Sequence, residues 1–206
     1  MEDDAQLLEA WRDGEQRAGR ILFERYYDPL ARFFRNKVGA EAPDLVQRTF
    51  LGCVEGLDRF RGEGSFRSYL FAVAYRQLCK HYRDESKQRE RFDVGTVTAY
   101  DLDPTPSRAL ARRREQRLLL EALRRIPVEF QVALELHYWE QMPAYEIAAA
   151  LDCPVGTMKS RIRRGRQMLG EQLEQLATSP AELKSTMGNI DDWAVALRAE
   201  ILGADE

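Results

Sequence analysis

The sequence predicts an all-α protein made of two small helical domains, a flexible linker and a C-terminal amphipathic helix. Over most of its 206 residues, apolar side chains recur at the three- and four-residue spacing of a helix, and strand signals are absent. From residue 85 to residue 107 this spacing stops. The segment there contains "DVGTVTAYDLDPTPS", whose polar composition with Pro and Gly is typical of a linker.

The first domain, residues 1–84, is expected to contain four helices. Gly14 and Gly19 interrupt the apolar pattern between residues 5 and 38, which favours two helices there rather than one. The segment "GAEAP" breaks the pattern again, and Ser65 stands where its side chain can cap the following helix. The last two helices of this domain are expected over residues 44–60 and from Phe66 to about Arg83.

The second domain, residues 108–176, has the pattern of a helical unit that ends in a helix-turn-helix. Its first helix is expected to stop at Ile126–Pro127, because proline cannot continue a helix from the preceding turn. Helices over 128–139 and 144–151 follow, and small residues at 148–150 would let the next helix approach closely.

The turn and the last helix of this domain carry local signals of their own. Asp152 lies where the turn needs a left-handed residue, and Pro154 suits the first position of a helix. Gly165 weakens the helix interior and has no role that the pattern suggests. The face that turns inward is expected to comprise Val155, Met158, Ile162 and either Leu169 or Gln167.

That last helix is strongly basic in a chain whose net charge is −3. Residues 155–169 include five Lys and Arg side chains and no acid. A helix that is merely solvated usually interleaves acids with its bases, so the pattern favours contact with a polyanion over a plain solvated face. In a helix-turn-helix the second helix enters the DNA major groove, where Arg and Lys read guanine edges or hold phosphates.

A second basic segment lies in the first domain. Residues 61–91 carry eight basic and four acidic side chains, and aromatic residues alternate with the bases in "FRGEGSFRSYLFAVAYRQLCKHYR". Aromatic and basic side chains on one element suit a nucleic-acid strand with unpaired bases. The alternative is that the aromatic residues build the core, since an inner face is expected at Phe66, Leu70, Val73 and Leu78.

The remaining composition indicates a reduced, cytoplasmic protein. The three cysteines are far apart, which argues against a disulfide framework or a CxxC metal clip. No run of 18 apolar residues would span a membrane, and the acidic start "MEDDAQLLEA" differs from a signal peptide. His81 and His137 are expected to be packing or surface residues, and no metal or cofactor is expected.

Two blocks of the sequence resemble bacterial RNA polymerase sigma factors. "PDLVQRTFLGCVEGLDRFRGEGSFRSYLFAVAYRQLCKHYR" resembles their conserved region 2, and "EALRRIPVEFQVALELHYWEQMPAYEIAAALDCPVGTMKSRIRRGRQML" resembles their region 4. Region 3 and a long acidic N-terminal region are missing from the pattern. The chain therefore looks like a sigma-70 family member of the extracytoplasmic-function (ECF) type, and the resemblance covers about residues 5–175.

The resemblance implies a function and its partners. A sigma factor directs core RNA polymerase to specific promoters and promotes DNA opening for transcription initiation, without chemistry of its own. Its contacts would be the β′ clamp and the β flap of the polymerase, the duplex minus-35 element and the single-stranded minus-10 element. The existence of a cognate anti-sigma factor, the promoter sequence and the activating signal stay open. The implied domains are region 2 over 1–84, the linker over 85–107, region 4 over 108–176 and an extension over 177–206.

The resemblance also implies roles for individual residues. The residues that it implies for core-polymerase binding are Asp44, Leu45, Gln47, Arg48, Thr49 and Phe50. Binding of minus-10 DNA falls to the loop Arg61, Gly62, Glu63, Gly64 and Ser65 and to Phe66, Arg67, Tyr75, Arg76 and Lys80. Binding of minus-35 DNA falls to Thr157, Lys159, Ser160, Arg161, Arg163 and Arg164.

Two positions depart from the family pattern. Arg76 stands where family members commonly carry Asn, and Lys80 stands where Asp is frequent. Both changes make the helix more basic, and they leave the minus-10 base preference open.

The extension, residues 177–206, lies outside the resemblance. It carries two basic and six acidic side chains, and its apolar stripe comprises Ile190, Trp193, Leu197 and Ile201. A stripe of this kind is rarely left exposed in a soluble chain. The extension could pack on the second domain as structure, or it could lie over the basic helix as a regulatory cover.

Two other classes of protein compete with the sigma reading. A helix-turn-helix repressor or activator would also need a basic helix, but the block over 44–83 would be useless to it. An enzyme would need a recognisable site, and the sequence contains no Walker loop, HExxH motif, nucleophile elbow or clustered His, Cys and acid set.

Overall fold

The computed structural model describes residues 3–57, 60, 64–86 and 114–177. Regular structure within these ranges is helical, as expected, and none of it is strand. The predicted C-terminal amphipathic helix lies outside the described residues, as does residue 87 onward of the linker. The elements are α1 (Asp4–Arg12), α2 (Gln16–Val38), η1 (Gly39–Glu41), α3 (Ala42–Gly56), α4 (Phe66–Ser86), α5 (Arg114–Arg124), α6 (Val128–Leu134), η4 (Glu135–Trp139), α7 (Ala144–Ala150) and α8 (Val155–Leu176).

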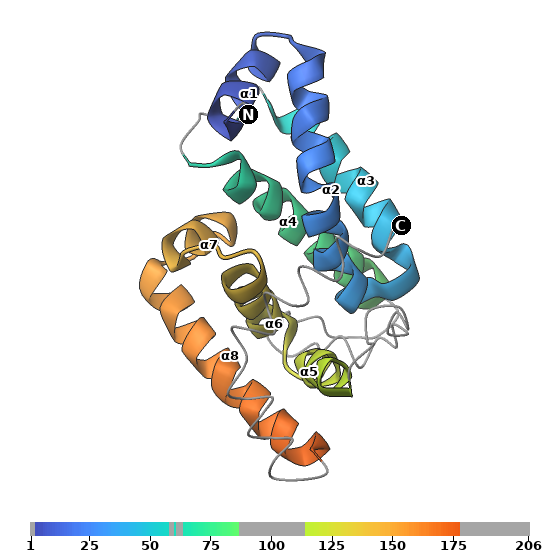
Figure 1. Cartoon of the computed structure of the whole chain (residues 1–206), viewed down its shortest axis with the longest axis vertical. Coiled ribbons are helices and arrows are strands. Elements are labelled where there is room, and N and C mark those ends of the chain that lie inside the picture. Colours follow the sequence, from blue (N-terminus) through green and yellow to red (C-terminus); the bar gives the residue numbers. More distant parts are fainter. Residues whose placement is uncertain (1–2, 58–59, 61–63, 87–113, 178–206) are drawn as a thin grey trace.

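Helices α1 to α4 form one helical unit, drawn in blue to green in Figure 1. The predicted break at Gly14 is confirmed, because this residue has a φ of 100° between α1 and α2. The predicted break at Gly19 is wrong. Gly19 lies inside α2, and a Cβ there would come within 2.7 Å of the Trp11 ring. Glycine at this position therefore allows the indole to pack directly on the helix.

Two helix ends differ from their predicted places. Helix α3 ends at Gly56 instead of residue 60, and α4 continues to Ser86, through the first two residues of the predicted linker. The predicted cap of α4 is confirmed, since the Ser65 Oγ accepts a hydrogen bond from the Ser68 N–H at 3.1 Å. The core of this unit is fully shielded from water at Leu22, Leu30, Phe34, Cys53, Leu70, Phe71, Ala74 and Leu78.

Helices α5 to α8 form the second unit, drawn in yellow to orange in Figure 1. Helix α6 passes into a single π-helical turn, η4, where the sequence predicted one continuous helix. Asp152 has the predicted left-handed conformation, with a φ of 50°, in the turn between α7 and α8. Pro154 is the N-cap of α8, one position before its predicted place.

The inward face of α8 is narrower than the sequence suggested. Met158 and Leu169 are buried, but Val155 is 41% exposed and Gln167 is exposed. Gly165 is buried against α6, where a Cβ would lie 3.2 Å from the Phe130 Cβ and 3.3 Å from the Leu134 Cγ. Its role is thus the close approach of two helices, which the helical pattern alone did not reveal.

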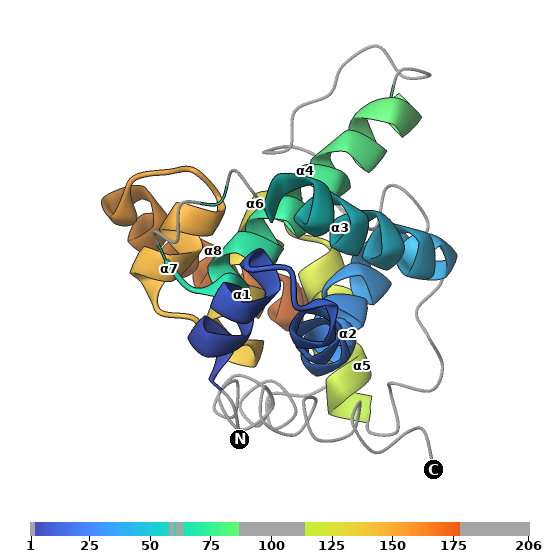
Figure 2. The same cartoon turned by 90° about the horizontal axis from the view of Figure 1, so that it is seen from above.

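The two units pack against each other. Figures 1 and 2 show α7 beside the N-terminal part of α4, which lies in the first unit. A single apolar cluster runs across the boundary, and it includes Leu70 and Phe71 from α4 together with Ile147 and Ala148 from α7. The sequence analysis predicted two domains and a linker, and it did not predict this contact.

Candidate polymerase and nucleic-acid interfaces

Helix α3 presents a mixed apolar and charged face to solvent. Asp44, Gln47 and Arg48 are exposed, and the Arg48 Nε lies 2.8 Å from an Asp44 carboxylate oxygen. One and two turns further along, Leu51 is 56% exposed and Val54 is 49% exposed. Neither Leu51 nor Val54 belongs to the set of residues that the sequence assigned to polymerase binding. Large exposed apolar side chains flanked by charges are typical of a protein-binding surface.

The other three residues assigned to polymerase binding are less accessible. Leu45 and Thr49 are buried, and the Thr49 hydroxyl donates to the Leu45 carbonyl oxygen at 2.7 Å. Phe50 is half-buried, and its ring stacks on Phe23 with centroids 4.4 Å apart. Leu45 and Thr49 therefore position α3 from within the core, while Phe50 packs on Phe23 and keeps part of its surface exposed.

The start of α4 brings part of the predicted minus-10 site together. Gly64 has a φ of 109°, so a glycine suits this position, while residues 61–63 lie outside the described residues. Phe66 is buried, and its ring packs edge-on against Trp11 and Tyr26. Phe66 is thus a core residue, as predicted by the alternative in which the aromatic residues build the core.

Arg67 is held by the second unit. One guanidinium nitrogen donates to the Glu140 carbonyl oxygen at 3.1 Å, and another lies 2.9 Å from a Glu146 carboxylate oxygen. Further along α4, Tyr75 is half-buried, and Arg76 and Lys80 are exposed. The contacts of Arg67 join residues more than 70 positions apart, so no local pattern could have revealed them.

Helix α8 carries its predicted DNA-binding side chains on the outside, with one exception. Arg161 is half-buried and forms an ion pair with Glu129 of α6 at 2.8 Å. The Arg164 guanidinium lies 5.9 Å from the centroid of the Phe130 ring, yet the residue is exposed. The exposed members of the predicted set are Thr157, Lys159, Ser160, Arg163 and Arg164.

Charged residues that the sequence did not single out lie between the two units. The Lys37 ammonium of α2 forms an ion pair with Glu135 of η4, and neither side chain reaches solvent appreciably. Burial lowers the pKa of Lys37 and raises the pKa of Glu135, and each charge partly offsets the effect on the other. Beside them, Arg32 of α2 pairs with Glu140 at 3.1 Å.

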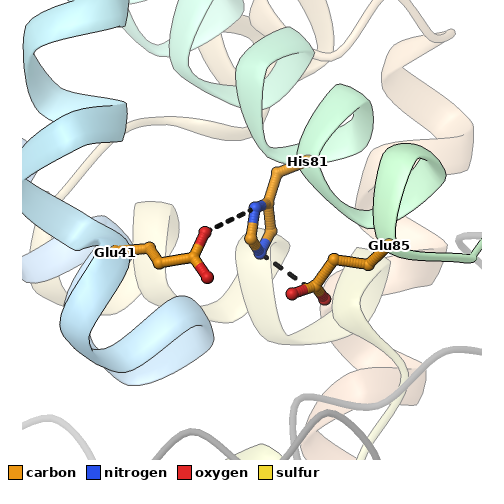
Figure 3. A group of neighbouring side chains, drawn as sticks. All are labelled: Glu41, His81 and Glu85. Atoms are coloured by element: carbon orange, nitrogen blue, oxygen red, sulfur yellow. Dashed lines mark ion pairs between the residues drawn. The ribbon is translucent and has the colours of Figure 1, made fainter.

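A second cluster, Glu41, His81 and Glu85, ties η1 to the last turns of α4 (Figure 3). The Nδ1 of His81 lies 3.2 Å from a Glu41 oxygen, and its Nε2 lies 3.7 Å from a Glu85 oxygen. The two carboxylates thus approach different ring nitrogens. A histidine offers one of these nitrogens to an ion, so two carboxylates at different nitrogens suit two separate side-chain contacts better than one three-ligand metal site.

The three cysteines differ in their burial. Cys53 is buried, and burial raises its pKa to about 12. Cys79 and Cys153 are half-buried, and all three are unpaired. In the part of the chain that the structure describes, no helix has the length and apolar character needed to cross a membrane.

Comparison with known proteins identifies the two units. The family model for sigma-70 region 2 matches residues 22–88, and the model for sigma-70 region 4 matches residues 116–169. The chain belongs to the sigma-70 family. It is a sigma factor of the ECF type, and it directs RNA polymerase to promoters for transcription initiation.

Curated relatives share this organisation along most of their length. The chain is 29% identical over 185 residues to the ECF RNA polymerase sigma-E factor of Haemophilus influenzae, with 84% of this chain and 96% of the relative covered. It is also 29% identical over 182 residues to the sigma-E factor of Escherichia coli K12, with 84% and 95% covered.

Solved structures show the same fold. CnrH in complex with the cytosolic domain of CnrY matches with a TM-score of 0.63 and 24% identity, over 84% of this chain and 99% of CnrH. The sigma factor RpoE from Bartonella quintana, solved with the anti-sigma factor NepR, matches with a TM-score of 0.56 and 21% identity, over 71% and 90%.

Proposed function

We propose that this sigma factor reads duplex minus-35 DNA with the outer face of α8, holds the unpaired minus-10 strand at the start of α4, and docks on the β′ clamp through α3. The observation that carries the proposal is the outer face of α8. Lys159, Arg163 and Arg164 are exposed there, and no acid occurs between residues 155 and 169. Such a face matches the negative potential of a duplex groove.

The side chains of α8 differ in how they meet DNA. Thr157 and Ser160 can contact either bases or phosphates, and the exposed Lys159 and Arg163 can reach guanine edges or the backbone. The Arg161 side chain is restrained, because its guanidinium forms an ion pair with Glu129. We assign it a positioning role on the flank of the reading surface. Region 4 would also meet the β flap of the polymerase.

The minus-10 strand would bind where α4 begins. The loop 61–65 supplies glycines that allow close approach to a nucleotide, and Arg67, Arg76 and Lys80 supply positive charge for the backbone. Tyr75 offers a ring face on which an unpaired base can stack. Binding an unpaired strand in preference to the duplex is what would promote DNA opening.

The exposed part of α3 would bind the polymerase. Asp44, Gln47 and Arg48 offer polar contacts, and Leu51 and Val54 offer apolar area that docking would bury. We place the protein in the cytoplasm with the polymerase and assign it no catalytic activity. An anti-sigma factor accompanies one structural neighbour, and we propose the same class of partner for this chain.

The decisive experiment is transcription by core polymerase with this protein on genomic fragments, followed by mapping of the transcript starts. The minus-35 sequence found in this way is then tested with Lys159→Ala, Arg163→Ala and, as a matched control, Arg166→Ala. Arg166 is an exposed base on the same helix outside the proposed reading set. Truncation of a base-reading side chain should cost about 1–3 kcal/mol of binding free energy on the cognate duplex. Equal losses for all three variants on every duplex would reject α8 as the reader.

A further inference from the structure

The outward face of α8 begins with a glycine. Met158, Gly165 and Leu169 are buried and mark the side of the helix that faces the second unit. Gly156 and Ser160 lie one helical turn apart on the opposite side, and both are exposed. Gly156 is the second residue of the helix, so it is the first position of this outward row.

No packing requirement within the described residues explains this glycine. A Cβ added at Gly156 would have no atom within 4 Å, and the backbone there lacks a positive φ. Other glycines inside helices differ, because a Cβ at Gly19, Gly52 or Gly165 would lie 2.7, 2.9 or 3.2 Å from a neighbouring side chain. Glycine is also a poorer helix former than alanine. In the free protein, Gly156 therefore lowers helix stability without allowing any closer packing.

The dimensions of the major groove make the size of this residue important for DNA binding. An α-helix with its side chains is about 10–12 Å across, whereas its Cα atoms lie only about 2.3 Å from the axis. The major groove is about 12 Å wide and about 8.5 Å deep. The side chains on the outward row therefore limit how closely the helix axis approaches the base edges. In a helix-turn-helix the amino end of the second helix contacts the bases, and a glycine there allows the closest approach.

Two of the residues assigned to duplex reading have short side chains. Thr157 and Ser160 are exposed, and each carries its hydroxyl directly on Cβ. Such a hydroxyl reaches a base edge only when the helix backbone lies close to it. Lys159 and Arg163 have long side chains that reach bases or phosphates from further away. The short residues thus set the depth at which α8 must enter the groove.

We propose that Gly156 is a clearance residue, whose missing side chain lets the amino end of α8 enter the major groove deeply enough for Thr157 and Ser160 to reach base edges. This inference rests on the proposed role of α8 in reading the minus-35 element. It adds a specificity-determining position outside the proposed set of contact residues, because Gly156 acts through the absence of a side chain.

The inference predicts which part of DNA binding depends on Gly156. The attraction of Lys159, Arg163 and Arg164 to phosphates acts over a Debye length of about 8–10 Å, so it persists when the helix stands slightly further out. A hydrogen bond from a hydroxyl to a base is lost beyond about 3.2 Å. A larger residue at position 156 should therefore reduce discrimination between promoter and other duplexes much more than it reduces general affinity for DNA.

The test uses the holoenzyme, assembled from core polymerase and the full chain with Gly156→Ala or Gly156→Leu. Binding is measured on the promoter fragment that transcript mapping identifies and on the same fragment with a scrambled minus-35 element. The ratio of the two affinities reports minus-35 discrimination. Gln175→Leu adds the same leucine at an exposed position near the other end of α8 and serves as the control.

We expect the ratio to fall about tenfold in Gly156→Leu, the effect of losing one base contact, and by a smaller factor in Gly156→Ala. Affinity for the scrambled fragment should stay within about twofold of the wild type. A ratio in Gly156→Leu equal to that of Gln175→Leu would overturn the inference. If Gly156→Leu loses its helical circular dichroism, Gly156→Ala decides by the same criterion against Gln175→Ala, because alanine is a better helix former than glycine.

A double-variant cycle separates the depth of the helix from a purely local clash. Ser160→Ala should lower the ratio in the wild-type background and change it little beside Gly156→Leu, since the hydroxyl is then already out of reach. Lys159→Ala should lower the ratio in both backgrounds. Equal effects of Ser160→Ala in the two backgrounds, including no effect in either, would also overturn the inference.

Failure of the proposed reading role would look different. In that case Lys159→Ala and Arg163→Ala would leave the ratio at its wild-type value. If these two variants lower the ratio while Gly156→Leu retains it, α8 remains the reader of the minus-35 element and only the clearance role is rejected.

Discussion

Lys37 and Glu135 form an ion pair that is removed from water on both sides, with side chains 0% and 2% exposed. The Lys37 ammonium also donates to the Phe33 carbonyl oxygen at 2.6 Å and lies 4.3 Å from the Phe33 ring centroid. Glu135 accepts a further hydrogen bond from the Gln131 amide at 2.9 Å. This enclosed pair is one of the contacts that join region 2 to region 4, and the loss of either partner would leave a buried charge unpaired.

Removing one partner of this pair should destabilise the protein strongly. Lys37→Met leaves the Glu135 carboxylate buried without its counter-charge, and a loss of about 3–5 kcal/mol in the free energy of unfolding is expected. Replacing both, with Lys37→Met and Glu135→Leu, should recover most of that loss, because no uncompensated charge remains. Urea unfolding measures both variants. A double variant as unstable as the single one would show that the pair supplies more than mutual neutralisation.

The pH dependence of the pair has a definite sign. Burial raises the pKa of Glu135 above its ordinary value of 4.5, so the folded state binds the carboxyl proton more tightly than the unfolded state does. Its contribution to stability is therefore full below pH 4.5 and is lost as pH rises through the folded-state pKa. The Glu135→Gln variant has no titratable side chain at this position and serves as the reference. The stability of the wild type relative to this variant should thus fall as pH rises from about 4.5, and a rise over that range would contradict the assignment.

Two glycines of α8 should respond oppositely to alanine. At Gly165 a Cβ would press on Phe130 and Leu134 at 3.2 and 3.3 Å, so overpacking should cost about 1–3 kcal/mol before the gain in helix propensity. At Gly156 no atom lies within 4 Å of a Cβ, so Gly156→Ala should gain up to about 1 kcal/mol. Thermal unfolding of the two variants measures the difference. Equal shifts in melting temperature would mean that α6 and α8 do not approach as closely as described.

Local features of this fold could be predicted from the sequence because local chemistry determines them. The Ser65 cap and the left-handed Asp152 each depend on a few neighbouring residues, and both are confirmed. The buried stripe of α4, including Phe66 and Leu70, follows from helical periodicity and is also confirmed. Gly19 was misread because its reason is the packing of Trp11, which a propensity rule does not contain.

Rules that consider only neighbouring residues could not predict the contacts between regions 2 and 4. Lys37 and Glu135 are 98 positions apart, and charged residues in a helix normally indicate a solvated face. One signal was available. Lys37 falls on the apolar stripe of α2 with Leu30 and Phe34, and Glu135 interrupts the apolar run "VALEL". A single base on one apolar stripe and a single acid on another indicate a buried partner for each, although not which partner.

The assigned DNA and polymerase contacts remain predictions, and the structure narrows which of them are physically available. Leu45, Thr49 and Phe66 are enclosed in the core, so their substitution would act through stability. Tests of function therefore belong on exposed positions, where a change in binding can be separated from a change in folding.

The exposed apolar residues of α3 offer such a test of polymerase binding. Leu51→Ser removes apolar area from the proposed docking face, and Tyr27→Ser removes it from α2, where the side chain is 51% exposed. Both changes should leave the free energy of unfolding within about 0.5 kcal/mol, because neither side chain is enclosed. If α3 docks on the clamp, Leu51→Ser should weaken binding to core polymerase about tenfold, as expected of a residue near the centre of an interface. Tyr27→Ser should bind as the wild type does.

Charge reversal on the same face gives a second, independent measure. Asp44 and Arg48 form an exposed pair whose net contribution is about 0–1 kcal/mol, so Asp44→Lys combined with Gln47→Ala should preserve the helical circular dichroism. Reversing a charge at the rim of an interface acts mainly on the association rate and its salt dependence, whereas loss of an apolar anchor acts on dissociation. Kinetic binding assays with core polymerase should therefore show a slower association for the Asp44 variant and a faster dissociation for Leu51→Ser. Wild-type kinetics in both would remove α3 from the polymerase interface and leave its exposed leucine and valine to another partner.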